Sequence, residues 1–198
     1  MNNIQLIKFE NSNYDKKILI IGVFHGDEPQ GEYFINSYIS SKPKNGKNAL
    51  YFIPRLNFNN VRQNKKGVDL NRNFPTKNWI LSEKNDYFGG KKPNSEIETQ
   101  FLTKLIDENK FDAIITIHSP YKTINYDGPA EILASKISEI IGYPTSSDIG
   151  YPTPGSFGTY CGVERSIPTI TIEIDEEENI EILNKKFLKL FNWLKSEY

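Results

Sequence analysis

The sequence predicts an α/β protein in which a mixed, mostly parallel sheet lies between two layers of helices. Short apolar runs rich in β-branched and aromatic residues alternate with stretches whose apolar residues recur at helical spacing, which is the pattern of such three-layer folds. A chain of 198 residues is long enough for one sizeable core, and no internal repeat or linker divides it. We therefore expect a single domain over residues 1–198.

Five apolar runs are predicted to form strands, at residues 4–9, 17–24, 49–53, 113–117 and 168–174. The run that starts at Ile18 is rich in β-branched and aromatic residues and carries no charge, so we expect it to be buried. Turn-forming residues fill positions 11–15 between the first two runs. This favours an antiparallel hairpin at the start of the chain.

Four helices are predicted. Pro29 can open the first because its missing N–H is not needed there, and Ser95 can cap a second that runs to about Glu108. The remaining two are expected at residues 129–141 and 176–195. The apolar stripe of the second helix is predicted to consist of Ile97, Phe101, Leu102 and Leu105.

Residues 55–94 resist assignment to regular structure and are rich in Asn, Lys and Gly. A loop of this length in a compact domain is usually functional or disordered.

Composition argues against several function classes. The 24 basic and 25 acidic residues give a net charge of -1, which does not suit a general binder of nucleic acid or membrane surfaces. No stretch approaches the roughly 18 apolar residues of a membrane span, and the N-terminus does not read as a signal peptide. A single cysteine, Cys161, rules out an internal disulfide. We expect a cytoplasmic protein.

The two histidines of the chain, His25 and His118, both lie where a predicted strand ends. Glu28 follows His25 by three residues, close enough for both to hold one ion from a tight turn. Hydrolytic zinc sites commonly have three protein ligands and keep one position for water. We interpret His25, Glu28 and His118 as a candidate ligand set, and leave open whether Asp27 orients a ligand or only forms the turn.

A hydrolytic zinc site also needs a general base. Glu173 is the leading candidate, because it is a carboxylate inside an otherwise apolar strand. Strand alternation equally allows Glu173 to face solvent together with Thr169 and Thr171. Asn71 and Arg72 could hold a carboxylate through an arginine fork and an amide donor, although they and Arg62 could also be surface residues.

Taken together, these segments resemble the zinc carboxypeptidases of the carboxypeptidase A superfamily, and within it the bacterial murein peptide amidases. Those enzymes cleave γ-D-glutamyl-diaminopimelate bonds. Several segments carry the resemblance in the order of the family: the turn at 25–28, Arg62, the stretch Gly-Val-Asp-Leu-Asn-Arg-Asn-Phe-Pro at 67–75, residues 95–98, 116–119, 151–157 and 170–173.

The resemblance implies one Zn²⁺ per chain, bound by His25, Glu28 and His118. It makes Glu173 the base that activates water. It also implies that Asn71 and Arg72 hold the terminal carboxylate of the substrate, and that Arg62 polarises the scissile carbonyl and stabilises the oxyanion. Tyr151 would be the mobile tyrosine of the family, with Tyr160 as a second candidate.

The expected substrate is therefore a small peptide with a free terminal carboxylate, as in recycling of cell-wall fragments. Two alternatives remain. An N-acyl amino acid deacylase of the succinylglutamate desuccinylase and aspartoacylase type also has an H-G-x-E turn and an Asn–Arg pair, but the segments at 67–74 and 154–157 favour the amidase branch. A non-catalytic peptide-binding module would have lost a ligand or the base, and here all these positions are filled. The sequence leaves the oligomeric state open.

Overall fold

The computed structural model of this protein describes residues 3–198 and contains a seven-stranded mixed sheet in the order β1-β3-β2-β4-β7-β5-β6. Four neighbouring strands are parallel: β3 (Ala49–Ile53), β2 (Lys17–Ile21), β4 (Ala113–His118) and β7 (Thr169–Glu173). The two flanks add antiparallel strands, β1 (Ile7–Phe9) on β3 and β5 (Thr123–Asp127) on β7, and the short β6 (Thr145–Ser146) runs parallel to β5.

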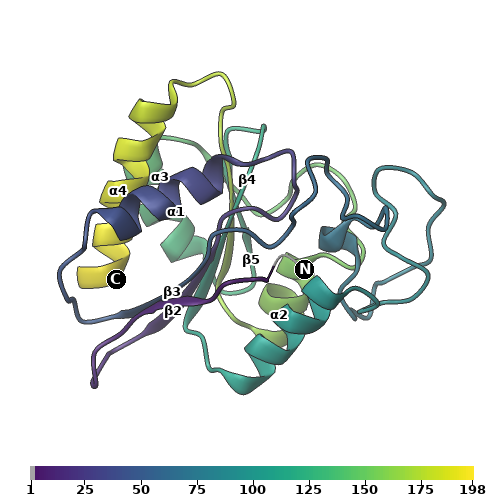
Figure 1. Cartoon of the computed structure of the whole chain (residues 1–198), viewed down its shortest axis with the longest axis horizontal. Helices are drawn as coiled ribbons and strands as arrows, with labels where there is room; N and C mark the ends of the chain where they lie inside the picture. The colour runs from purple at the N-terminus through teal and green to yellow at the C-terminus, as the bar shows by residue number, and fades with distance from the viewer. Residues whose placement is uncertain (1–2) are drawn as a thin grey trace.

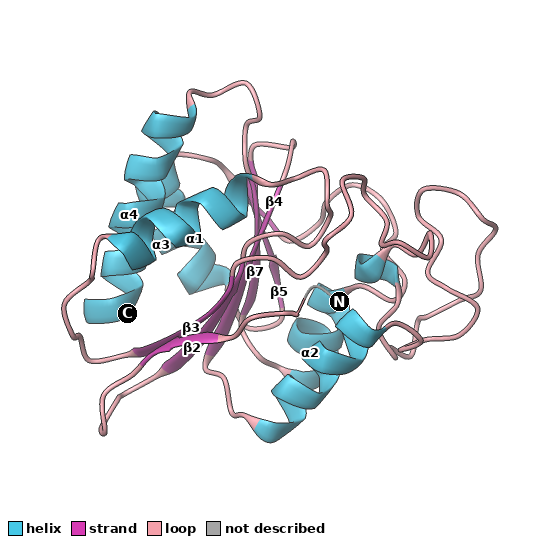
Figure 2. Cartoon of the chain, viewed as in Figure 1, coloured by secondary structure: helices cyan, strands magenta, loops and turns pink. Residues whose placement is uncertain are grey.

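Helices cover both faces of the sheet (Figure 1). One face carries α1 (Gln30–Ser40), α3 (Glu131–Ile141) and α4 (Ile180–Ser196). The other face carries α2 (Ile97–Glu108), the 3₁₀ turn η1 (Leu70–Arg72) and the π-helical turn η2 (Thr159–Val163). Long loops extend beyond α2 on this second face (Figure 2). The predicted three-layer α/β class is confirmed.

Strand alternation sends side chains into two separate cores. Ile20, Ile115 and Ile172 pack under α1, α3 and α4, whereas Leu19 and Ile114 pack toward α2 and η2. On the second face the pattern changes along β7, where Thr169, Thr171 and Glu173 replace the apolar residues. The sheet is therefore apolar on one face throughout and polar on the other near the carboxyl ends of its strands.

The predicted hairpin between the first two runs is wrong. β1 pairs with β3, with Ile7 opposite Phe52, and β2 lies between β3 and β4. The reason is the burial of β2: its residues Ile18 to Ile21 are apolar on both faces, so the strand is stable only in the sheet interior with parallel neighbours. The 11–15 turn instead carries the chain across from the edge.

Two further expectations at the element level were wrong. Ser95 does not cap α2, because the N-cap is Glu96, and the Ser95 hydroxyl donates to the Glu96 carboxylate instead. Ile97 is 69% exposed and does not belong to the buried stripe, which includes Leu102, Leu105 and Ile106. Strand β5 was not predicted, since only Ile124 and Tyr126 of its five residues are apolar.

The segment 55–94 is irregular apart from η1, and buried amide side chains hold it in place. The Asn73 Oδ1 accepts from the backbone of Ser95 at 3.0 Å and from the Thr99 hydroxyl at 2.7 Å, while its Nδ2 donates to the Gly89 carbonyl at 2.7 Å. Asn64 similarly donates to Glu96 at 2.9 Å. These bonds replace the backbone ladders that regular structure would supply.

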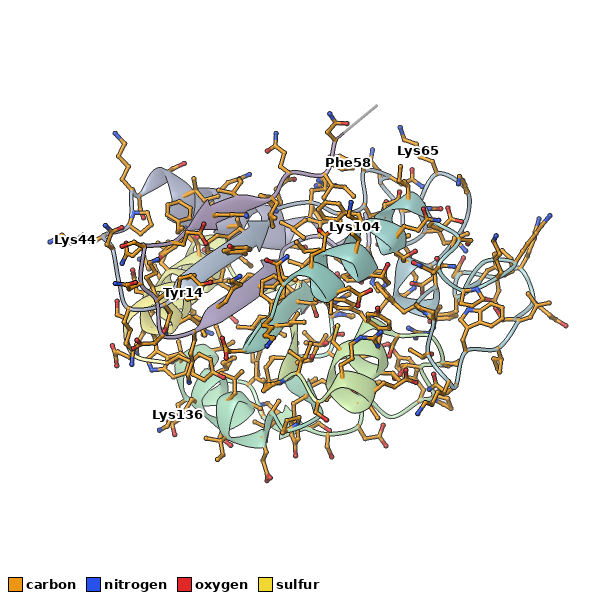
Figure 3. All side chains as sticks on the ribbon, turned by 90° about the horizontal axis from the view of Figure 1, so that it is seen from below. Tyr14, Lys44, Phe58, Lys65, Lys104 and Lys136 are labelled. Carbon is orange, nitrogen blue, oxygen red and sulfur yellow. The ribbon has the colours of Figure 1, made fainter. Side chains whose placement is uncertain are left out.

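The exposed Lys44, Lys65 and Lys136 come from three different parts of the chain and lie far apart at the periphery (Figure 3). Within residues 3–198, we find no helix with both the length and the apolar character that a membrane crossing requires.

Candidate active site

The candidate residues meet at the carboxyl edge of the parallel strands. His118 is the last residue of β4 and lies beside Glu173, the last residue of β7. His25 and Glu28 follow β2, which is the strand from which the chain moves to β3 on one side and later returns to β4 on the other. Open α/β sheets bind ligands at such a switch point because the loops diverge there.

The turn after β2 places His25 and Glu28 on the same side. The Glu28 amide donates to the His25 carbonyl at 3.2 Å, and the Gly26 amide donates to the Val61 carbonyl at 3.1 Å. A Cβ on Gly26 would stand 1.9 Å from the Asn59 carbonyl oxygen, so no larger residue fits. The glycine between the two side chains thus lets segment 59–61 pack directly on the turn.

The three predicted ligands converge. Glu28 lies between the histidines, with Oε1 2.8 Å from His25 Nδ1 and Oε2 2.9 Å from His118 Nδ1, and the two Nδ1 atoms are 3.2 Å apart. One donor atom from each residue falls within 4.8 Å of the others, and all three side chains are buried. This group could hold a metal ion, and a set of two imidazoles and one carboxylate suits catalytic zinc.

The electrostatics of this cluster also favour a cation. Burial alone would lower the pKa of His25, but the Glu28 and Asp69 carboxylates outweigh burial and raise it to about 9. Burial would likewise raise the pKa of Glu28, but the two histidines lower it to about 2. For His118, burial outweighs the charge of Glu28 and lowers the pKa. The carboxylates therefore attract positive charge to His25, either as a proton or as a metal ion in its place.

Asp69 is a member of this site that the sequence interpretation missed. It is fully buried and accepts from Arg62 Nε at 2.9 Å and from the Asn71 amide at 2.8 Å, and its Oδ1 lies 3.3 Å from His25 Nε2. A carboxylate on the far nitrogen fixes the tautomer and orientation of a ligating imidazole. The one sequence signal for Asp69 is its position between two apolar residues, Val68 and Leu70, which does not by itself reveal its partners.

Asp27 does not take part. Its side chain is exposed, and it makes no side-chain hydrogen bond in the part of the chain that the structure describes. The sequence left open whether Asp27 orients a metal ligand or only forms the turn, and the geometry matches a turn residue.

Glu173 faces the pocket rather than solvent. It is 5% exposed, and its Oε2 is buried without a hydrogen-bond partner within residues 3–198. Burial, and after it the charge of Glu28, raises the pKa of Glu173 to about 8. The solvent-facing alternative was therefore wrong: Thr169, Thr171 and Glu173 do share a face, but site loops cover that face.

The proposed clamp residues line the same pocket as the metal-ligand group. Asn71 and Arg72 belong to η1, and the Asn71 Oδ1 accepts from the Phe157 amide at 2.8 Å, which leaves its NH₂ group for the pocket. Arg72 is 6% exposed. Arg62 is held by Asp69 and lies with its guanidinium 4.8 Å from the centre of the Tyr87 ring.

The structure separates the two tyrosine candidates. Tyr151 lines the pocket with Arg72 and Glu173, and burial raises its pKa to about 12. Tyr160 is 1% exposed and packs in the core, 5.5 Å from the Phe74 ring and with Arg165 over its own ring at 3.4 Å. Only Tyr151 of the two is placed to reach a ligand.

Comparison with known proteins agrees with this geometry. The family model described as zinc carboxypeptidase matches residues 2–136, and the chain belongs to this family. It is 33% identical over 147 residues to murein peptide amidase A of Escherichia coli K12, and 32% identical over 174 residues to murein peptide amidase A of Vibrio campbellii. These matches cover 68% and 79% of this chain, and 60% and 68% of the two relatives.

Solved structures show the same fold. The murein-tripeptide amidase of Escherichia coli O157 superposes with a TM-score of 0.81 at 25% identity, over 96% of this chain and 86% of that chain. Thrombin activatable fibrinolysis inhibitor gives a TM-score of 0.80 at 18% identity, over 96% of this chain and 64% of that chain, a likeness of fold alone. The chain spans 60% of the length of the Escherichia coli K12 relative.

Proposed function

We propose that this chain is a zinc-dependent hydrolase that cleaves an amide bond in a small peptide with a free terminal carboxylate. The observation that carries the proposal is the convergence in one pocket of a His/Glu/His group, an Asn–Arg pair and a buried glutamate whose Oε2 has no hydrogen-bond partner within residues 3–198. The similarity to murein peptide amidases supports a narrower assignment, the γ-D-glutamyl-diaminopimelate bond of a murein peptide.

The proposed ion is one zinc per chain, which the Glu28 carboxylate and the two Nδ1 atoms that face it, those of His25 and His118, would hold. When bound, zinc supplies a Lewis acid that polarises a carbonyl and makes water a stronger nucleophile near neutral pH. Asp69 keeps the far nitrogen of His25 protonated, so that Nδ1 presents its lone pair to the ion.

Glu173 is the proposed base. Its Oε2 has no partner in the described chain and faces the pocket that the ligand group shares, so it can accept a proton from the attacking water. A carboxyl whose pKa lies close to neutrality can also return that proton to the leaving amine. Both transfers use one side chain on a rigid strand end, which keeps the geometry fixed through the reaction.

The substrate is held by the cationic side of the pocket. The Arg72 fork and the Asn71 NH₂ group bind the terminal carboxylate through charge-assisted hydrogen bonds. Arg62, fixed by Asp69, is placed to stabilise negative charge that develops on the scissile carbonyl oxygen. Tyr151 lines the same pocket as this clamp and is proposed to close over the bound residue.

The deacylase alternative has less support, because the named relatives are murein peptide amidases. We further propose that the chain acts as one domain in the cytoplasm on peptides released from the cell wall. The proposed cytoplasmic location rests on the single cysteine, Cys161.

The test is a hydrolysis screen with the zinc-loaded protein, read by mass spectrometry. Its three arms are a murein tripeptide, a set of N-acyl amino acids and a set of ordinary C-terminal peptides. We expect cleavage at the γ-D-glutamyl bond of the tripeptide and about one zinc per chain by metal analysis. Preferential cleavage of the acyl amino acids, or a protein that cannot be loaded with metal, would overturn the proposal.

A further inference from the structure

Tyr87 lies beside the two arginines of the site, although the proposed mechanism gives it no role. The Arg62 guanidinium lies over the Tyr87 ring, with its carbon 4.8 Å from the ring centre, and the Arg72 guanidinium carbon lies 5.8 Å from the same centre. Both distances are within the roughly 6 Å reach of a cation–π contact. One aromatic ring therefore contacts the group proposed to stabilise the oxyanion and the group proposed to hold the terminal carboxylate.

Core packing does not account for the position of Tyr87. It is 50% exposed, whereas its neighbour Phe88 is buried. Tyr87 lines a second cavity of about 310 Å³, which adjoins the pocket of the metal-ligand group because Arg72 and Tyr151 line both. A half-exposed aromatic ring gains only part of the free energy of burial. Its contacts with the arginines are therefore the feature of Tyr87 that needs a reason.

The backbone around Tyr87 is fixed to the segments that carry the two arginines. The Tyr87 amide donates to Asn85 Oδ1 at 2.8 Å, and the Phe88 carbonyl accepts from the Asp69 amide at 2.8 Å. Gln63 Nε2 donates to the Asn85 carbonyl at 2.6 Å, which ties this turn to the residue after the first arginine. The ring and the two guanidiniums are thus placed by one connected set of contacts.

Each guanidinium combines one polar anchor with its contact to the ring. Arg62 Nε donates to Asp69 at 2.9 Å, and Arg72 Nη1 donates to the Asn71 carbonyl at 2.7 Å. An arginine side chain keeps considerable rotamer freedom until further contacts restrict it. Guanidiniums stack on aromatic faces, so the Tyr87 ring restricts both side chains and excludes water from part of each. The ring also attracts two like charges that repel each other.

We propose that Tyr87 is a positioning residue, which holds the Arg62 and Arg72 guanidiniums in place for the scissile carbonyl and the terminal carboxylate of the substrate. The inference rests on the proposed function and adds to it a residue that none of the motifs at the site includes. Donors that are fixed before the substrate arrives need no reorganisation during the reaction. Loss of the ring should therefore weaken substrate binding through Arg72 and slow the reaction through Arg62.

The experiment compares the zinc-loaded parent with Tyr87→Leu, Tyr87→Phe and Tyr14→Leu, by steady-state kinetics on the murein tripeptide. Loss of a cation–π contact changes an equilibrium by about 2- to 30-fold. Tyr87→Leu should therefore raise KM and lower kcat, each by about 2- to 30-fold. Tyr87→Phe keeps the ring and should recover most of both losses, which a general loss of stability would not predict.

Tyr14→Leu is the matched control. Tyr14 is 39% exposed and has the Lys17 ammonium 5.6 Å from the centre of its ring, but it precedes β2 and so lies at the end of that strand opposite to the site. The control should match the parent in kcat and KM. Parent-like kinetics in Tyr87→Leu, or a Tyr87→Phe variant as impaired as Tyr87→Leu, would overturn the inference.

A measurement without substrate separates this inference from the proposed function. In nitrogen–proton NMR spectra, the ring current of Tyr87 should shift the Arg62 Nε–H signal upfield, and the signal is assigned by its loss in Arg62→Lys. Tyr87→Leu should lose this shift and Tyr87→Phe should keep it. If the parent cleaves no peptide, the proposed function fails, and the spectra still decide where the ring lies. An Arg62 signal at the same position in the parent and in Tyr87→Leu would refute the role of Tyr87.

Discussion

Replacing Asp69 with asparagine removes one buried negative charge and changes almost nothing in size. Asp69 contacts three parts of the site at once: His25 Nε2 at 3.3 Å, Arg62 Nε at 2.9 Å and the Asn71 amide at 2.8 Å. An asparagine Oδ1 can still accept from the Asn71 amide. It cannot provide a charged partner for Arg62 and an ionic acceptor for the His25 ring.

The magnitude follows from those losses. A hydrogen bond to a charged group contributes about 1.5 to 3 kcal/mol, and removing one partner of a buried pair leaves the other uncompensated. Because Arg62 is partly accessible to water, we expect Asp69→Asn to lower the free energy of unfolding by about 2 kcal/mol. Loss of the acceptor behind a ligating imidazole typically weakens metal affinity by about 10- to 100-fold.

Zinc affinity is measured by competition with a chromophoric chelator, and stability by urea titration of the metal-free protein. Asp27→Asn is the matched control, since it makes the same chemical change on an exposed carboxylate two residues from His25. The control should leave both quantities unchanged. If Asp69→Asn bound zinc as tightly as the control, the buried acid would not orient His25 and the proposed ligand geometry would need revision.

Three further predictions concern the base, the clamp and the pH dependence of stability. Glu173→Gln should retain zinc but lower kcat by about 10²- to 10⁴-fold, measured by steady-state kinetics with metal analysis; near-normal turnover would place the base elsewhere. Arg72→Ala should raise KM by about 10- to 100-fold for peptides with a free terminal carboxylate, and a parent that cleaves C-terminally amidated peptides equally well would contradict the clamp. In chelator-treated protein, burial and then the Glu28 charge raise the pKa of Glu173 from 4.5 to about 8. A pKa raised on folding means that this contribution to stability is complete below pH 4.5 and is lost as pH rises through about 8. Urea titrations should therefore find that Glu173→Gln and the parent are similar in stability at about pH 5. At about pH 9 the variant should be more stable by up to several kcal/mol, since each pKa unit corresponds to about 1.4 kcal/mol. A stability difference that stays constant across this pH range would refute the raised pKa of Glu173.

The sheet interior could be predicted because its residues leave little choice. The runs 49–53 and 113–117 are apolar on both faces, and such runs are stable only as interior parallel strands. β5 escaped prediction for the opposite reason, since Asn125 and Asp127 lower its strand propensity. Those residues are polar because they form the wall of a pocket, so local propensity fails where the site is built.

The sequence predicts where strands lie better than it predicts which strands pair with each other. The sequence around 11–15 has turn chemistry, and a local hairpin is the simplest solution to it. The actual partner of β1 is β3, more than forty residues later, and Ile7 pairs with Phe52 there. Non-local pairing depends on which strand exposes a free edge after the interior is assembled, and no window of the sequence carries that information.

Site residues with rare side chains could be found, whereas their supporting contacts could not. Two histidines at strand ends are conspicuous in a chain that has only two. Strand alternation places Glu173 on the same face of β7 as Thr169 and Thr171. It does not specify whether solvent or other parts of the chain cover that face. Asp69 was missed because its role is defined by three partners that lie two, seven and 44 residues away.

The two glutamates of the site illustrate how the fold assigns different roles to one side chain. Both carboxylates are buried in the same pocket, at 8% and 5% exposure for Glu28 and Glu173. Glu28 lies between two imidazoles, which lower its pKa to about 2. Glu173 has no hydrogen-bond partner on Oε2 in the described part of the chain, and burial raises its pKa to about 8. A group that stays ionised suits a metal ligand, and a group that titrates near neutrality suits proton transfer. The separation arises from backbone placement. The 25–28 turn presents Glu28 to both histidines, whereas Glu173 at the end of β7 forms no hydrogen bond with either of them within residues 3–198. Glu28 could act as the base, and Glu173 as a metal ligand, only if the end of β7 moved relative to the 25–28 turn. The geometry therefore points to Glu173 as the base.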